Sequence, residues 1–198
     1  GDGIDDTKER FSYDYEKIAK ILYMTNADII ALQEVENEKA IEKVTEYLQG
    51  YNFFVANGTG KQNVAFLYNP KLEIRIVGDY QTINVEPGRT RPGLIANVKK
   101  GNFDFILMNV HLKSTSRYDS TDELREKSYK LRQEQATAIS NWVDSLQKYS
   151  KEKDIIILGD FNDNPLRKSH PTLTPLLINK KLSFLTAELK SCQNPKWD

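Results

Sequence analysis

The chain has 198 residues, 39% of them hydrophobic and 28% charged, which is enough for one domain with a substantial core. Lysine plus arginine and aspartate plus glutamate both number 28, and the resulting net charge of zero argues against a strong long-range attraction to nucleic acid. No apolar run approaches the roughly 20 residues that span a bilayer. A single cysteine, Cys192, excludes an intramolecular disulfide and a cysteine metal cluster.

The amino-terminal sequence, GDGIDDTKERF, lacks the basic and apolar regions of a signal peptide. Such a segment is removed from a mature secreted protein, so the compartment stays open. We expect a soluble monomer, and secretion or a periplasmic location in a bacterium is compatible with the sequence.

The first quarter of the chain predicts two helices and a strand. Residues 14–24 have helical spacing, with Ile18, Ile21 and Leu22 on the buried face. Residues 27–35, ADIIALQEV, predict a buried strand with a polar exit. A second amphipathic helix is predicted from its N-cap at Asn37 to a stop at Gly50. Its inward face has four members: Ala40, Ile41, Val44 and Leu48.

The pattern then changes to short strands separated by turn residues. These strands are predicted at residues 52–56, 63–68, 73–80, 94–100 and 103–112. Residues 122–146 have helical spacing, and the inward face comprises Leu131, Ala138, Ile139, Val143 and Leu146. A last buried strand is predicted at residues 154–159. This mixture predicts an α/β fold in which two β-sheets pack face to face and the helices lie outside them.

Three predicted strands become polar where they end. The first ends at Gln33-Glu34, another at Asn109-Val110-His111, and the last at Asp160-Phe161-Asn162. If these strands lie side by side, their terminal side chains meet in one pocket. Carboxylate and amide oxygens suit Mg²⁺, Mn²⁺ or Ca²⁺, and an imidazole beside them titrates near neutral pH. Each residue alone also has a structural explanation, as a loop acid, a buried histidine or a turn cap.

Three motifs at these strand ends resemble those of the endonuclease/exonuclease/phosphatase superfamily, whose fold is DNase I-like: LQEVEN, NVHLKS and ILGDFNDNP. The segment RTRPGLIANV resembles the Arg-x-Pro-Leu segment of the bacterial nuclease-like branch. The resemblance extends from about Tyr15 to Pro165. It implies a layered sandwich and a Mg²⁺- or Mn²⁺-dependent hydrolase of phosphodiester or phosphomonoester bonds, with nucleic acid among the candidate substrates.

The resemblance also implies a role for each matching residue. Glu34 matches the glutamate that holds the metal, and Asp160 the aspartate that orients or activates the attacking water. His111 matches a histidine that flanks the phosphate, and Asn162 an asparagine that contacts it. Two further residues are expected on the phosphate side, Arg91 as a direct ligand and Asn109 as a hydrogen-bonding neighbour.

Two expected motifs are not found in the sequence. Family members open with a strand that carries a metal-linked asparagine, and they close with a Ser-Asp-His-like segment that supplies an aspartate and a second histidine. Here the second of the two histidines, His170, follows the Gly-Asp-Phe-Asn loop directly and is expected to be a loop residue. We therefore expect residues 1–198 to be a single domain without its first strand and its carboxy-terminal catalytic segment.

Other interpretations stay open to different degrees. A phosphate-binding loop of the G-x-x-x-x-G-K-[ST] type fails in NGTGKQNV, because Val55 replaces the first glycine and Gln62 replaces the Ser or Thr. A degenerate member that only binds a phosphorylated or nucleic-acid partner is the main alternative.

Lys113 and Arg117 are either part of a phosphate path or solvated loop charges. The substrate itself stays open among DNA, RNA, inositol phosphates and lipid head groups.

Overall fold

The computed structural model describes residues 10–56 and 62–188. Residues 1–9, 57–61 and 189–198 lie outside this description, and with them Cys192 and most of the glycine-lysine loop considered above. Three strands form one antiparallel sheet in the order β1 (Ile29–Val35), β3 (Asn63–Tyr68), β2 (Asn52–Val55). Four strands form the other sheet in the order β4 (Glu73–Tyr80), β5 (Gly93–Lys100), β6 (Phe103–His111), β7 (Ile155–Asp160).

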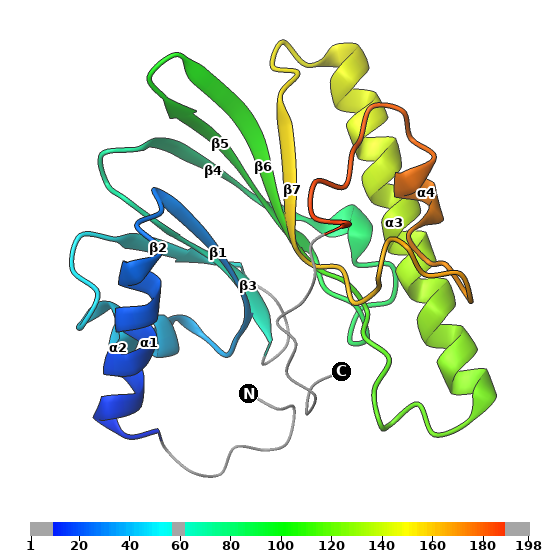
Figure 1. The fold of residues 1–198 in the computed structure, drawn as a ribbon, viewed down its shortest axis with the longest axis horizontal. Helices are drawn as coiled ribbons and strands as arrows, with labels where there is room; N and C mark the ends of the chain where they lie inside the picture. Colours follow the sequence, from blue (N-terminus) through cyan, green and yellow to red (C-terminus); the bar gives the residue numbers. More distant parts are fainter. Residues whose placement is uncertain (1–9, 57–61, 189–198) are drawn as a thin grey trace.

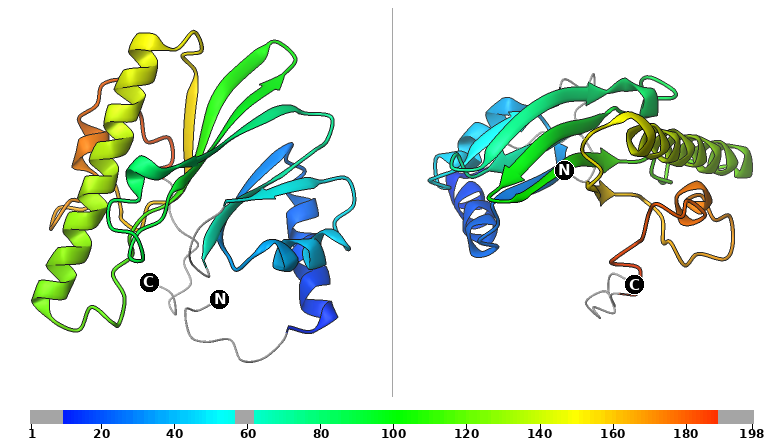
Figure 2. Two further views of the ribbon diagram at one scale, coloured as in Figure 1. Left: turned by 180° about the vertical axis from the view of Figure 1, so that it is seen from behind. Right: turned by 90° about the horizontal axis from the view of Figure 1, so that it is seen from above.

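The two sheets lie between two layers of helices (Figures 1 and 2). Helices α1 (Ser12–Met24) and α2 (Glu38–Thr45) cover the three-stranded sheet. The long helix α3 (Asp122–Tyr149), the short helix α4 (Thr174–Leu177) and the 3₁₀ turn η1 (Gln81–Ile83) cover the other. The predicted α/β sandwich with helices outside is confirmed.

Each contact between layers has its own apolar core. The core between the sheets includes Phe66, Leu94 and Leu107, all fully buried. Ile41, Val44 and Leu48 pack against the outer face of the three-stranded sheet, as predicted. On the other side, α3 contributes Leu131, Ile139 and Val143, which are also buried as predicted, while Ala138 and Leu146 are half-buried.

The connection between β6 and β7 brings two of the three polar strand ends together. These strands are parallel, and α3 makes the crossover between them, as a parallel pair requires. Thr121 caps α3 by accepting a hydrogen bond from the backbone nitrogen of Leu124 at 3.3 Å. The register pairs His111 with Asp160, so the ends of β6 and β7 coincide.

The predicted inward face of the first helix is wrong at two positions. Ile18 is 36% exposed and Ile21 is 66% exposed. The buried side of α1 is instead centred on Ala19, with Tyr15 and Leu22 packing beside it. The small Ala19 side chain allows α1 to lie close to the core, and this rotates the larger isoleucines outward. In α2, Asn37 caps the helix as predicted, accepting from Ala40 N at 3.0 Å, but the helix ends at Thr45 rather than at Gly50.

The prediction that residues 27–35 and 154–159 form buried strands is only partly correct. The corresponding strands β1 and β7 are edge strands among the described residues, most of their side chains are half-buried, and Ile156 on β7 is 37% exposed. A continuous apolar sequence indicates that both faces of a strand carry side chains able to pack in a core. It does not indicate which other strands form hydrogen bonds with its backbone. No helix in the described part of the chain has the length and apolar character needed to cross a membrane.

Candidate active site

The carboxy-terminal ends of β1, β6 and β7 bring two carboxylates and one imidazole together. Nε2 of His111 lies 3.9 Å from Oε1 of Glu34 and 3.9 Å from Oδ2 of Asp160. The imidazole is almost fully buried, whereas the Glu34 and Asp160 side chains are 40% and 50% exposed. Both carboxylates are therefore open to solvent, whereas the imidazole near them is buried.

The backbone at Glu34 is unusual for a strand. The pairing register of β1 with β3 shifts between Leu32 and Val35, which marks a bulge, and Glu34 has φ +58°. Positive φ costs a residue with a Cβ on the order of 1–2 kcal/mol. Bulges redirect a side chain out of the regular alternation of a strand. An energetic cost at this position is consistent with a function for the carboxylate.

The end of β7 has a similar local geometry. Oδ1 of Asp160 accepts a hydrogen bond from the backbone nitrogen of Asn162 at 2.8 Å, which leaves Oδ2 on the side of His111. Asn162 has φ +52°, and its side-chain amide donates to the carbonyl of Leu112 at 3.0 Å. The loop is thereby held against the segment that follows β6.

Asn109 connects the two sheets beneath the site. Its side chain is fully buried, and its amide nitrogen donates to the carbonyls of Leu32 and Ala65 at 3.0 and 2.9 Å. Its oxygen accepts from Nε2 of Gln33 at 2.8 Å. Both amide hydrogens and the oxygen thus have partners inside the protein, and this one side chain fixes β6 against both β1 and β3.

His111 is neutral at neutral pH in this environment. Burial, and to a smaller extent the positive charge of Arg91, lower its pKa to about 4, while the negative charge of Asp160 opposes the shift. Nδ1 of the ring is buried and has no hydrogen-bond partner among the described residues. A neutral imidazole offers one N–H donor and one acceptor nitrogen.

Arg91 lies close enough to His111, Glu34 and Asp160 for their charges to interact. Burial lowers the pKa of its guanidinium, while the charges of Glu34 and Asp160 raise it. Its Nη2 donates to Oε1 of Gln62 at 3.2 Å, and both residues line a pocket that also reaches His111. The structure therefore brings Arg91 to the same site as the two carboxylates.

Two charged residues behind the site were not singled out from the sequence. Arg132 on α3 is 1% exposed, and it donates to the carbonyl of Asn162 and to Oγ1 of Thr115, the latter at 3.1 Å. Asp163 is also buried, and accepts from the backbone nitrogens of Asn164 and Thr172 at 2.9 and 3.1 Å. A signal existed for Arg132, because it falls next to Leu131 on the predicted inward face of the helix.

His170 has its own surroundings on the surface. Its Nε2 lies 3.1 Å from Oε1 of Glu126, and its ring stacks on Tyr129 at 5.1 Å between centroids. Both partners belong to the first turns of α3, and the His170 side chain is 53% exposed. None of its described contacts is with Glu34, His111 or Asp160.

The donors at the site suit a hard divalent cation held in an open manner. Within residues 10–56 and 62–188, no group of three or more His, Cys, Asp or Glu side chains is arranged to hold a metal ion by itself. Mg²⁺ is commonly held by one or two carboxylates, with waters and substrate phosphate completing the octahedron. The half-exposed carboxylates of Glu34 and Asp160 fit that mode of binding.

The fold is a sandwich of two sheets between helices, and acids, an imidazole and a guanidinium lie near the ends of its strands. This combination is typical of a family of phosphate-ester hydrolases. Residues 4–182 match the sequence profile of the Endonuclease/Exonuclease/phosphatase family, and the chain belongs to this family. A search of curated protein sequences gives no significant match.

Solved structures with the same fold include a truncated TDP2 from Caenorhabditis elegans, with a TM-score of 0.62, 20% identity and coverage of 84% of this chain and 61% of that one. An endonuclease/exonuclease/phosphatase family protein from Bacteroides thetaiotaomicron has a TM-score of 0.58, with 21% identity and coverage of 81% and 57%. The human Nocturnin catalytic domain with bound sulfate has a TM-score of 0.58, with 15% identity and coverage of 86% and 64%. The chain thus spans about six-tenths of the length of these structures.

Proposed function

We propose that the protein is a divalent-metal-dependent phosphoesterase that hydrolyses phosphodiester or phosphomonoester bonds by attack of water. The observation that carries this proposal is the position of the buried His111 ring, 3.9 Å from a carboxylate oxygen of Glu34 and 3.9 Å from one of Asp160. Family membership supports the same class of reaction. The relatives include a TDP2 from D. rerio complexed with a single-strand DNA product, which favours nucleic acid among the candidate substrates.

Glu34 is the proposed metal ligand, and the carboxylate of Asp160 adds negative charge to the same site. Mg²⁺ or Mn²⁺ held there would neutralise charge on a phosphate oxygen and would make a nearby water molecule more acidic. The positive φ of Glu34 holds its carboxylate away from the regular face of β1 and toward the site.

Asp160 is proposed to take a proton from the attacking water. The backbone nitrogen of Asn162 binds Oδ1, so the carboxylate is oriented and Oδ2 remains available as the acceptor. The remaining amide hydrogen of Asn162 is proposed to contact the phosphate, since the other is used by the Leu112 carbonyl.

His111 and Arg91 are proposed to bind the phosphate oxygens. Because burial keeps the imidazole neutral, it acts as a hydrogen-bond donor rather than as a fixed positive charge. The Arg91 guanidinium then supplies the charge. Asn109, whose polar atoms all have internal partners, is proposed to hold the strand ends in place rather than to bind the phosphate.

The described residues place two carboxylates and one histidine at the site, whereas the family resemblance implies a further asparagine, aspartate and histidine. We propose that residues 1–198 form one domain and that full activity requires these groups from outside the described residues. The full-length gene product is therefore the form to assay.

The test combines metal binding and hydrolysis. Calorimetry with Mg²⁺ and Mn²⁺ should show binding that Glu34→Gln removes, with Glu73→Gln on the exposed end of β4 as the matched control. The full-length protein should hydrolyse bis(4-nitrophenyl) phosphate with Mg²⁺ and lose this activity with EDTA. Hydrolysis that is unaffected by EDTA or by Glu34→Gln would contradict the proposal. Metal and oligonucleotide binding without any hydrolysis would instead favour the degenerate, binding-only member.

A further inference from the structure

A pocket of about 260 Å³ extends from His111 away from the two carboxylates. It is lined by three cationic side chains, Arg89, Arg91 and Lys113, and by one carboxylate, Asp119. Gln62 and Ser116 add polar atoms to the lining. The volume is smaller than that of most sites for whole drug-sized ligands, so it suits a compact charged group.

The positive charges of this pocket are incompletely compensated. Among the described residues, no carboxylate lies within ion-pair distance of Lys113 or Arg91, and the contacts of Arg89 with Asp119 and Glu86 are both long at 3.7 Å. Asp119 is itself occupied, since its Oδ2 accepts from the backbone nitrogen of Ser116 at 2.9 Å. Burial lowers the pKa of Lys113, Asp119 opposes this, and the guanidiniums of Arg89, Arg132 and Arg91 lower it further.

The turn that carries Arg89 and Arg91 is fixed before any ligand arrives. The backbone nitrogens of Arg89 and Thr90 both donate to the carbonyl of Glu86, at 3.0 and 2.9 Å. Oγ1 of Thr90 accepts from the backbone nitrogen of Glu86 at 2.9 Å and donates to Oδ1 of Asn84 at 3.0 Å. A preformed turn places the backbone of both arginines at the pocket wall, so this backbone loses little entropy when a ligand binds.

We infer that this pocket binds a second phosphate group of the substrate, next to the phosphate at which the bond is cleaved. The inference rests on the proposed function, and it narrows the substrate class to molecules with at least two phosphates. The Arg89 guanidinium can bind this second phosphate through paired N–H donors, and the half-buried ammonium of Lys113 adds a point charge, while Arg91 remains with the scissile phosphate. His111 lies between the carboxylates and the pocket, so the scissile phosphate and its neighbour would occupy adjacent positions on either side of the ring.

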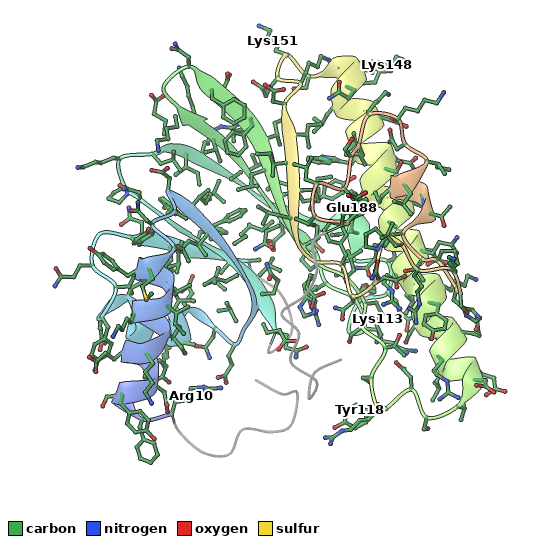
Figure 3. The ribbon with its side chains drawn as sticks, in the orientation of Figure 1. Arg10, Lys113, Tyr118, Lys148, Lys151 and Glu188 are labelled. Atoms are coloured by element: carbon green, nitrogen blue, oxygen red, sulfur yellow. The ribbon has the colours of Figure 1, made fainter. Side chains whose placement is uncertain are left out.

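The rim of the pocket favours a nucleotide as the source of that phosphate. Tyr118 lines the pocket and is 67% exposed; the Arg117 guanidinium lies over one face of its ring at 5.1 Å, which leaves the opposite face for a nucleobase. Figure 3 shows Lys113 and Tyr118 at the same end of the molecule, with Lys148 and Lys151 at the opposite end. The second phosphate can be an internal phosphodiester or a terminal phosphomonoester, and the two share the chemistry that the pocket recognises.

The experiment compares three thymidine substrates: TpT with one phosphate, TpTpT with a neighbouring phosphodiester, and pTpT with a terminal phosphomonoester. In the full-length protein with Mg²⁺, kcat/KM for TpTpT or pTpT should exceed that for TpT by about 10-fold or more, the effect of one charge-assisted contact. Lys113→Met and Arg89→Gln should each reduce this ratio toward one. Lys151→Met, an exposed lysine far from the pocket, is the control and should leave the ratio unchanged. If kcat/KM relative to TpT is larger for TpTpT, the pocket prefers an internal phosphodiester. If it is larger for pTpT, the pocket prefers a terminal phosphomonoester.

Calorimetric binding of pTpT separates this inference from the proposed function. Its Kd should rise about 10-fold in Lys113→Met and in Arg89→Gln but not in Lys151→Met, whether or not the bond is cleaved. Loss of hydrolysis with this binding pattern intact contradicts the proposed function alone. Equal kcat/KM for all three substrates, or pTpT binding that neither variant weakens, overturns the second phosphate site. Thermal melting of each variant verifies that it is folded.

Discussion

Gly159 on β7 and Val110 on β6 lie so close together that a Cβ on Gly159 would be 2.0 Å from the Val110 carbonyl oxygen. Gly159 also has φ +132°, a conformation that residues with side chains rarely adopt. The pair directly precedes His111 and Asp160 in the parallel register. The glycine of the Gly-Asp-Phe-Asn motif therefore permits the strand contact that aligns the imidazole with the carboxylate.

Gly159→Ala should lower the free energy of unfolding by about 3 kcal/mol or more, because both the strained φ and the clash with backbone must be relieved. Urea denaturation measures the loss. Gly101→Ala is the matched control, since Gly101 has φ +62° but no atom within 4 Å of the new Cβ, and it should cost only about 1 kcal/mol. Equal losses for the two variants would show that the contact with Val110 relaxes without cost.

Asn109→Asp should destabilise the protein by about 2–4 kcal/mol, because a carboxylate would face the carbonyls of Leu32 and Ala65 in place of an amide donor. The same change at Asn141, which is exposed on α3, should alter stability by less than about 0.5 kcal/mol. Chemical denaturation of both variants provides the comparison. If Asn109→Asp unfolds at the same denaturant concentration as the wild type, the amide does not connect the two sheets as described.

Asp160→Asn should reduce hydrolysis by about 100-fold or more in the presence of Mg²⁺, because an amide cannot accept a proton from water. The amide oxygen can still accept from the backbone nitrogen of Asn162, so thermal stability should be unchanged or slightly higher. The assay uses bis(4-nitrophenyl) phosphate, with Asp154→Asn, an exposed residue directly before the same strand, as the control. Turnover close to that of the wild type would leave Asp160 as a structural cap of the loop.

Asp163→Asn should destabilise the protein by about 2 kcal/mol near neutral pH, the scale of buried hydrogen bonds to a charged group. Burial alone would raise the pKa of Asp163, but hydrogen bonds from Thr172 and Asn164 and the charge of Arg132 together lower it below its ordinary value. A lowered carboxyl pKa stabilises the fold at pH values above the unfolded pKa of about 3.9. This contribution is lost as the pH falls through the folded pKa.

The difference in unfolding free energy between the wild type and Asp163→Asn should therefore be constant from pH 7 to about 5 and shrink below about pH 4. Urea denaturation across this range measures it. If the difference in unfolding free energy stays the same down to pH 3, the negative charge of Asp163 does not contribute to the interactions with its partners.

The sequence predicted the layers of the fold because apolar periodicity reports which side of a helix or strand is buried. It also indicated Glu34, His111 and Asp160 as polar ends of apolar strands, and the structure brings these three together. It misplaced Ile18 and Ile21 because two faces of α1 carry apolar residues, and packing alone decides between them.

Other features depend on contacts between distant segments. The positive φ of Glu34 arises from a bulge against β3, and Arg132 is buried because the Asn162 carbonyl lies across from α3. Among the described strands, β7 pairs only with β6, and its own sequence does not predict this. The periodicity of apolar residues along a strand contains no information about which strands pair with it.

The positive φ values of Glu34 and Asn162 have a consequence for protein engineering. A search for heat-tolerant variants would favour glycine at Glu34, because glycine adopts this backbone conformation without strain. Glu34→Gly would then score as an improvement in melting temperature while it deletes the carboxylate proposed to hold the metal. Selection for thermostability therefore has to exclude these two positions or be paired with a metal-binding measurement at every round.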